Sequence, residues 1–228
     1  MLGIVGGVGP AATVLYYRSI IEGYGRLRKD QHYPEMIIYS LDMGRVTELF
    51  EAGRLDELAD GLVKVVGLMK SGGCDLGLLA CNSMHLVFDR VQSRVELPLV
   101  NLIETVVDEV RQRGWSKVGL MGTTFAMRSG LYHDPLQGAG IECLVPPEAE
   151  QDWIMAAILS DLQQAVVPRE TTQRLARAAE ELGSRGGEGV ILGCTDLPAG
   201  LSGTDCDLPI LDSTRIHVKR ILELVAND

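Results

Sequence analysis

Short apolar runs alternate with longer amphipathic stretches along the whole chain. In the amphipathic stretches, for example residues 54–70 and 171–182, apolar positions recur at helical spacing. Short apolar runs bounded by glycine, proline and polar residues are typical of buried parallel strands. The pattern predicts strands at residues 2–5, 36–41, 76–80, 99–102, 118–121, 142–145, 190–192 and 210–211. Strands and helices in alternation indicate an α/β fold with parallel sheets flanked by helices.

The order of these segments occurs twice. Each half has a glycine-containing strand, a second strand, a long polar-rich helix ending in glycines, and an apolar strand ending in a cysteine. The landmarks lie 116, 113 and 111 positions apart, and they are Gly3 with Gly119, Cys81 with Cys194, and Leu97-Pro98 with Leu208-Pro209. This near-constant offset predicts two similar Rossmann-like or flavodoxin-like domains, related by a pseudo-twofold duplication.

The domain boundaries follow from the repeat. We expect a first domain of residues 1–104 plus 212–228, which carries Cys81, and a second of residues 105–211, which carries Cys194. The last predicted helix, residues 214–226, is expected to pack back on the first domain. No low-complexity linker separates the halves, so we expect the two domains to be docked tightly.

The twin cysteines are the strongest chemical signal. Ligands of doubly wound sheets bind outside the carboxyl ends of the strands, where Cys81 and Cys194 are predicted to lie. A thiol at a helix N-terminus has a lowered pKa. Two matched thiols in one cleft suit inversion at a carbon with an acidic hydrogen, because one removes a proton while the other delivers one. Backbone N–H groups with Asn82, Ser83 and Thr195 could hold the α-carboxylate as charge develops.

Cysteines also serve as core residues, disulfide partners and metal ligands. A cysteine after a strand is commonly a small buried hydrophobe, which is our interpretation of Cys74, Cys143 and Cys206. A disulfide between Cys81 and Cys194 is unfavourable in a reducing compartment. A zinc site lacks support because the sequence has no C-x-x-C motif. We therefore predict no metal.

Composition narrows the function classes. The chain has 228 residues, 46% of them hydrophobic and 23% charged, and a net charge of -10, which argues against nucleic-acid binding. No apolar run approaches the ~20 residues of a membrane span. No secretion signal is visible, and five cysteines without framework spacing indicate reduced thiols. We expect a cytoplasmic protein that acts on a small molecule.

The opening segment leaves a different enzyme class open. Gly7-x-Gly9-x-x-Ala12 formally matches the dinucleotide-binding pattern, and Asp42 is a candidate ribose ligand for an NAD-dependent oxidoreductase. Asp42 lies 30 positions beyond Ala12, Pro10 interrupts the pattern, and this hypothesis gives the two cysteines no role. We instead expect the backbone at Gly9 to close over a small carboxylate beside Cys81. A non-enzymatic two-lobed binding protein is a further alternative.

The motifs together resemble the aspartate/glutamate racemase family of cofactor-independent amino-acid racemases. The motifs that carry the resemblance are GGVGPAAT (6–13), CNSMH (81–85), GCTD (193–196) and LDSTRIH (211–217). The resemblance implies that Cys81 and Cys194 are the proton donor and acceptor and that Asn82, Ser83 and Thr195 hold the substrate. It also implies a homodimer, no cofactor, and aspartate or glutamate as substrate.

The chain departs from the family pattern at several positions. Ser83 stands where Thr is frequent, Asp196 where Glu is frequent, and Gln163 with Gln164 near a lysine that helps hold aspartate in relatives. The missing lysine argues against strict aspartate specificity. Because related folds use one or both cysteine positions in other reactions, a decarboxylase or isomerase of small dicarboxylic acids, or a hydantoin racemase, stays open as an alternative.

Further polar residues are candidates to contact the substrate. Arg45 is the nearest candidate for an arginine that holds a carboxylate in relatives. The loop after the second half's first strand contains Thr124, another predicted substrate contact, and Arg128, which could pair with a side-chain carboxylate or lie at the surface. We interpret His85 as a structural residue at a helix start.

Overall fold

The computed structural model describes residues 1–28, 30, 32–162, 166–204 and 206–226, so Gln163 and Gln164 lie outside the described residues. The chain divides into two compact units, residues 1–102 with 217–228, and residues 103–216. Within the described residues each unit contains a four-stranded sheet.

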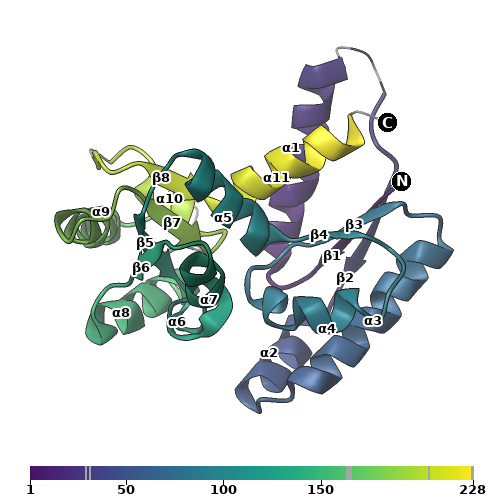
Figure 1. Ribbon diagram of the computed structural model, residues 1–228, viewed down its shortest axis with the longest axis horizontal. Helices are drawn as coiled ribbons and strands as arrows, with labels where there is room; N and C mark the ends of the chain where they lie inside the picture. The colour runs from purple at the N-terminus through teal and green to yellow at the C-terminus, as the bar shows by residue number, and fades with distance from the viewer. Residues whose placement is uncertain (29, 31, 163–165, 205, 227–228) are drawn as a thin grey trace. The chain divides into compact units, whose positions relative to one another are not determined.

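The first unit is built on a parallel sheet whose strand order is β2-β1-β3-β4. Its strands are β1 (Leu2–Gly6), β2 (Met36–Ser40), β3 (Leu76–Leu79) and β4 (Leu99–Val100). Its helical elements are α1 (Pro10–Arg28), α2 (Met43–Glu51), α3 (Leu55–Ser71), the 3-10 helix η1 (Ser83–Val87) and α4 (Phe88–Gln92). Figure 1 shows β1 inside this sheet, between β2 and β3.

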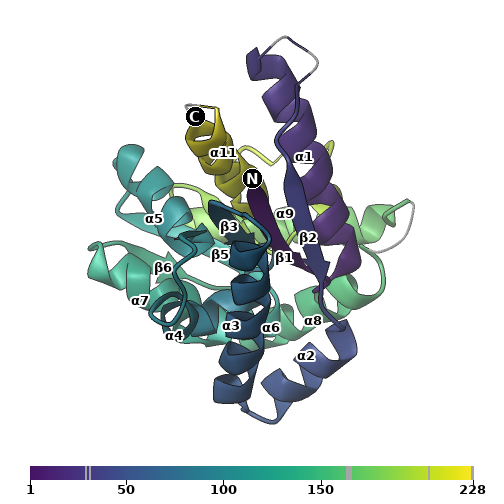
Figure 2. The same ribbon diagram turned by 90° about the vertical axis from the view of Figure 1, so that its right-hand side faces the viewer.

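Alternation along the strands gives this sheet two apolar faces. Leu2 and Ile4 of β1 pack with Tyr16 and Ile20 of α1 and with the C-terminal half of α11 (Ser213–Val225). Val5 faces the other way and packs with side chains of α2, α3, η1 and α4. Figures 1 and 2 show α1 together with α11, and α2, α3 and α4 together as a separate group. Burial on both faces explains why the inner strands β1 and β3 are continuously apolar.

The second unit repeats this topology. Its parallel strands are β5 (Lys117–Gly122), β6 (Glu142–Leu144), β7 (Val190–Gly193) and β8 (Ile210–Asp212), in the order β6-β5-β7-β8. Its helices are α5 (Leu102–Gln112), α6 (Thr124–Arg128), α7 (Gly130–Gly138), α8 (Glu148–Leu159), α9 (Arg169–Ser184) and α10 (Leu197–Leu201). The predicted fold class, two α/β domains with parallel sheets, is confirmed.

Two details of the predicted elements were wrong. The strand predicted at residues 99–102 ends at Val100, and Leu102 already begins α5. Helices α2 and α8 were not predicted as separate elements between the second strand and the long helix of each half. The sequence does signal α2, because Asp42 accepts hydrogen bonds from the N–H groups of Gly44 and Arg45, as an N-cap residue does.

Gly7 is required by the loop that follows β1. Its φ is +93°, and a Cβ there would lie 2.3 Å from the backbone oxygen of Leu41. We expect Gly7→Ala to lower the free energy of unfolding by about 3 kcal/mol or more, because left-handed strain adds to overlap with backbone that cannot rotate away. Chemical denaturation measures the change.

Gly53 offers a matched control for Gly7. It also has a positive φ, +66°, but a Cβ there would meet no heavy atom within 4 Å. Gly53→Ala should therefore show only the conformational cost of about 1 kcal/mol. Equal losses in the two variants would contradict the role given to the close approach between Gly7 and Leu41.

Candidate active site

The carboxyl ends of parallel strands meet at one edge of each sheet, and the candidate residues of the first unit follow these ends. Gly9 lies in the loop after β1, Arg45 in the first turn of α2 after β2, and Cys81 two residues after the end of β3. Val8 and Cys81 pack against the same apolar cluster of this unit. Because β1 lies between β2 and β3, this order places the Gly9 loop between the other two segments.

The half-buried Cys81 lies two residues before Ser83, the first residue of η1. Its thiol is hydrogen-bonded to the backbone N–H groups of Met84 and Ser83 and to the Ser83 side chain. Asn82, which is 5% exposed, forms the turn between Cys81 and η1. The local structure thus brings Cys81, Asn82 and Ser83 together at a helix start.

The direction of the Cys81 pKa differs from the sequence-based expectation. Burial raises the pKa of the Cys81 thiol, and it outweighs the lowering by the hydrogen bonds from Met84 and Ser83. The predicted N–H donors are present, but the loss of thiolate hydration raises the pKa by more than these hydrogen bonds lower it. In this structure Cys81 is therefore held in its thiol form at neutral pH.

One donor of the glycine loop is used within its own unit. The N–H of Gly7 donates to Oγ1 of Thr13 at 2.8 Å, and the Thr13 hydroxyl lies 3.5 Å from the carbonyl oxygen of Gly9. Asp42, the candidate ribose ligand, is the N-cap of α2. Its Oδ1 accepts hydrogen bonds from the N–H of Gly44 at 2.9 Å and the N–H of Arg45 at 3.4 Å. A dinucleotide would need both groups, so this geometry disfavours the oxidoreductase alternative.

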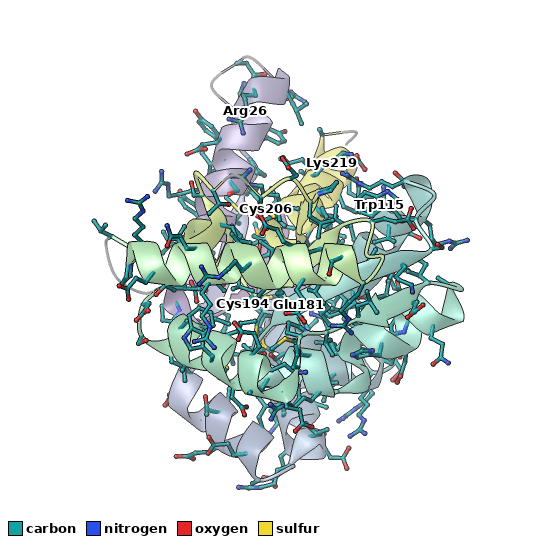
Figure 3. All side chains as sticks on the ribbon, turned by 90° about the vertical axis from the view of Figure 1, so that its left-hand side faces the viewer. Arg26, Trp115, Glu181, Cys194, Cys206 and Lys219 are labelled. Carbon is teal, nitrogen blue, oxygen red and sulfur yellow. The ribbon has the colours of Figure 1, made fainter. Side chains whose placement is uncertain are left out.

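In the second unit Cys194, labelled in Figure 3, directly follows β7. Thr195 and Asp196 come next, all three half-buried, and α10 begins at Leu197. Burial raises the pKa of the Asp196 carboxyl. Thr123 caps α6 by accepting from the N–H of Ala126 at 3.2 Å, and Thr124 is the first residue of that helix.

Arg45 has several charged neighbours. With Arg54, Glu57 and Lys64 it lines a cavity of about 410 Å³ between α2 and α3, and its charge helps to lower the pKa of Glu57 after the larger effect of Arg54. The side chain is exposed. The structure thus places Arg45 in the first turn of α2, among charges of both signs.

Arg128 is bound to α8 of its own unit. Its Nε donates to Oε1 of Gln151 at 2.9 Å, and one terminal nitrogen contacts Asp152 at 2.6 Å and the Glu148 carbonyl oxygen at 3.3 Å. Gln151 is 4% exposed and also donates to the carbonyl oxygen of Pro146 at 2.7 Å. Arg128 is exposed, and these partners hold it within its own unit.

A buried polar network next to Cys81 was not predicted from the sequence. Tyr16, His85 and His217 are 0%, 6% and 0% exposed. Nδ1 of His217 lies 2.9 Å from the Tyr16 hydroxyl, and its Nε2 lies 3.0 Å from the carbonyl oxygen of Val100. His217 stands inside the LDSTRIH motif, and its apolar flanks were the signal that it is buried.

Membrane-spanning helices and metal-binding clusters are both absent from the part of the chain that the structure describes. No helix there is both long and apolar enough to cross a membrane. No group of three or more His, Cys, Asp or Glu side chains in the described ranges is arranged to hold a metal ion.

Comparison with known proteins agrees with this architecture. The family model of the Asp/Glu/Hydantoin racemases matches residues 5–221. The broad specificity amino-acid racemase RacX of Bacillus subtilis (strain 168) is 27% identical over 227 residues, which are 96% of this chain and 95% of the relative.

Solved structures show the same similarity. A crystal structure of an aspartate racemase homologue from Pyrococcus horikoshii OT3 has a TM-score of 0.85 and 32% identity, with 99% of this chain and 98% of that chain covered. A crystal structure of an Asp/Glu racemase candidate from Yersinia pestis has a TM-score of 0.92 and 26% identity, with the same coverage. The resemblance inferred from the motifs is confirmed: the chain belongs to the Asp/Glu/Hydantoin racemase family and is an enzyme of the isomerase class.

Proposed function

We propose that this enzyme is a cofactor-independent racemase of an amino acid, aspartate or glutamate, and that Cys81 and Cys194 perform the proton transfers. One observation carries the proposal. The two sheets have the same strand order, and in each the strand beside the central one, β3 beside β1 and β7 beside β5, is followed within two residues by a cysteine and then by a short helical segment. Repetition of a thiol at one topological position is expected of paired acid and base groups.

The reaction needs two groups of similar chemistry. One thiolate removes the α-proton from one face of the substrate, and the opposite thiol protonates the carbanion from the other face. The reverse reaction exchanges these roles, so the mechanism requires both thiols to reach one α-carbon from opposite sides. Each turnover therefore moves a proton from carbon to one sulfur and a different proton from the other sulfur to carbon.

The raised pKa of Cys81 suits this exchange. Burial keeps the substrate-free thiol protonated, which is the form that donates a proton. When ionised, a thiolate of higher pKa is also the stronger base. We propose that Asn82, Ser83 and Thr195, with Gly9 and Thr124, hold the substrate carboxylate and the charge that develops on it.

The relatives of this chain are named for different substrates. RacX is named as having broad specificity, and other relatives are named for glutamate or aspartate. A dicarboxylic amino acid would need a cation for its second carboxylate, and we propose Arg45 for this role. We also propose that the enzyme is cytoplasmic and that it is a homodimer. Multi-angle light scattering tests the homodimer by its molar mass.

A panel of L- and D-amino acids tests the proposed function. Purified enzyme without added cofactor should convert either enantiomer of aspartate or glutamate into the racemic mixture, followed by chiral chromatography. Assays of carbon dioxide release, maleate conversion and hydantoin racemisation should stay at background. Conversion only in one of those assays would contradict the proposal and identify the alternative reaction.

Two arginine variants separate substrate binding from stability. We expect Arg45→Met to raise KM for the dicarboxylic substrate about 10-fold or more, since a charge-assisted pair is worth roughly 1.5–3 kcal/mol. Arg128→Met should change KM less than about twofold and lower the free energy of unfolding by about 1 kcal/mol, because Arg128 and its ion-pair partner Asp152 are both exposed. Steady-state kinetics measures KM, and chemical denaturation measures the free energy of unfolding. A KM effect confined to Arg128→Met would reverse the assignment.

A further inference from the structure

We propose that His85 is a positioning residue for Cys81: its imidazole fixes the peptide of Cys81 and so keeps the amide donors of η1 directed at the thiol. The relevance of this device to turnover depends on the proposed racemase function. The device itself is a property of the resting protein and can be measured there.

The hydrogen bonds of His85 define which nitrogen carries its proton. The N–H of Leu102 donates to Nε2 of His85 at 3.1 Å, so Nε2 is an acceptor. Nδ1 lies 2.9 Å from the carbonyl oxygen of Cys81, which can only accept, so Nδ1 carries the proton and donates. The ring thus connects the Cys81 peptide to the first residue of α5.

The ring of His85 is held in place on several sides. It stacks on Phe88 with ring centroids 5.4 Å apart and an angle of 6° between the planes. His217 meets it edge-on at 6.2 Å, and His217 is itself fixed between Tyr16 and Val100. Both imidazoles are neutral, because burial lowers their pKa values to about 4 for His85 and about 3 for His217. A neutral, immobile ring gives the carbonyl of Cys81 one fixed direction.

The direction of that carbonyl determines the geometry at the sulfur. The backbone from Cys81 to His85 forms a single turn, in which the N–H of His85 donates to the carbonyl oxygen of Asn82 at 3.0 Å. Within the same turn the thiol is hydrogen-bonded to the N–H groups of Ser83 and Met84. Rotation of the Cys81 peptide would move the sulfur away from both donors. These donors are the groups that stabilise the thiolate against burial.

Two amide substitutions divide the functions of the imidazole. Asn at position 85 places an N–H group near the position of Nδ1, so His85→Asn can donate to Cys81 but cannot reach Leu102. Gln places its oxygen near the position of Nε2, so His85→Gln can accept from Leu102 but leaves the carbonyl of Cys81 without its donor. Tyr16→Phe removes a buried hydrogen bond of the same network that does not touch the Cys81 turn, and it serves as the stability control.

The measurement is the pH dependence of Cys81 alkylation by iodoacetamide, resolved by peptide mass spectrometry so that other cysteines do not contribute. We expect His85→Gln to raise the midpoint for Cys81 by about one pH unit through loss of thiolate donors. His85→Asn and Tyr16→Phe should stay within about 0.3 unit of wild type, even where thermal denaturation shows a lower midpoint temperature.

The outcomes separate this inference from the proposed function. A midpoint that is the same in wild type, His85→Gln and His85→Asn would overturn the positioning role and leave only a structural one. A raised midpoint in His85→Gln together with a wild-type midpoint in His85→Asn would support the positioning role, whether or not the wild-type enzyme racemises any amino acid. Absence of racemisation by the wild type would instead count against the proposed function alone.

Discussion

Cys81→Ser and Cys194→Ser should each lower the racemisation rate by about 1,000-fold or more. A hydroxyl of the same shape can neither ionise near neutral pH nor donate a proton as readily as a thiol, and general acid–base catalysis contributes about 100- to 10,000-fold. Each variant loses the acid–base group on one face of the α-carbon. Conversion from L to D and from D to L should slow together, because both pass through the same carbanion. Chiral chromatography of both enantiomers measures the loss.

Cys206→Ser is the matched control for these two variants. Cys206 is half-buried like Cys81 and Cys194, and its sulfur lies 4.0 Å from the carbonyl oxygen of Leu208. It should keep the wild-type rate within about twofold, since the sulfur–carbonyl contact is weak. If Cys194→Ser retained full activity while Cys81→Ser did not, the enzyme would use a single base, and the two-thiol mechanism would have to be abandoned.

The second large effect is loss of stability in mild acid. The ordinary histidine pKa of about 6.5 is lowered to about 4 in His85 and about 3 in His217 by burial. Between pH 6.5 and 4 the unfolded chain therefore binds up to two more protons than the folded protein, and stability falls as pH falls. At about 1.4 kcal/mol per pH unit for each group, the free energy of unfolding should drop by about 4 kcal/mol from pH 7.5 to 5.0.

His217→Gln isolates the histidine contribution. Its amide can still donate to the Val100 carbonyl oxygen from the position of Nε2, and it does not titrate, so the loss between pH 7.5 and 5.0 should be about half that of wild type. Burial raises the pKa values of Asp196 and Asp212, which opposes the histidines in acid and is common to both proteins. Denaturant titrations at several pH values give the comparison. Parallel curves for the two proteins would show that His217 is not buried in its neutral form.

Much of the fold could be predicted because its signals are local. The strands at residues 2–6 and 190–193 are continuous apolar runs, and the matched cysteines reveal the duplication without any contact information. The end of β4 could not be predicted, since Leu102 is apolar and suits either a strand or the helix that it begins. That choice depends on its N–H, which donates to His85 from a distant part of the chain.

The candidate site was predicted less completely, because it depends on burial. The helix start at Cys81 and its donors follow from sequence, but the sign of the pKa shift depends on how much water reaches the sulfur. In the same way, Arg128 is bound by Gln151 and Asp152, which lie more than 20 positions away. The partners of a long polar side chain are decided by packing, and the sequence holds no period or motif that shows them.

Solvent deuterium tests the central claim, proton transfer by two different thiols, most directly. The enzyme is incubated in deuterium oxide with one pure enantiomer of aspartate or glutamate and stopped at low conversion, and both enantiomers are separated and examined by NMR. We expect deuterium at the α-carbon of the product and ordinary hydrogen in the recovered substrate, because the donor thiol exchanges with solvent and differs from the base. Equal labelling of both enantiomers, or racemisation with no deuterium in the product, would contradict the account.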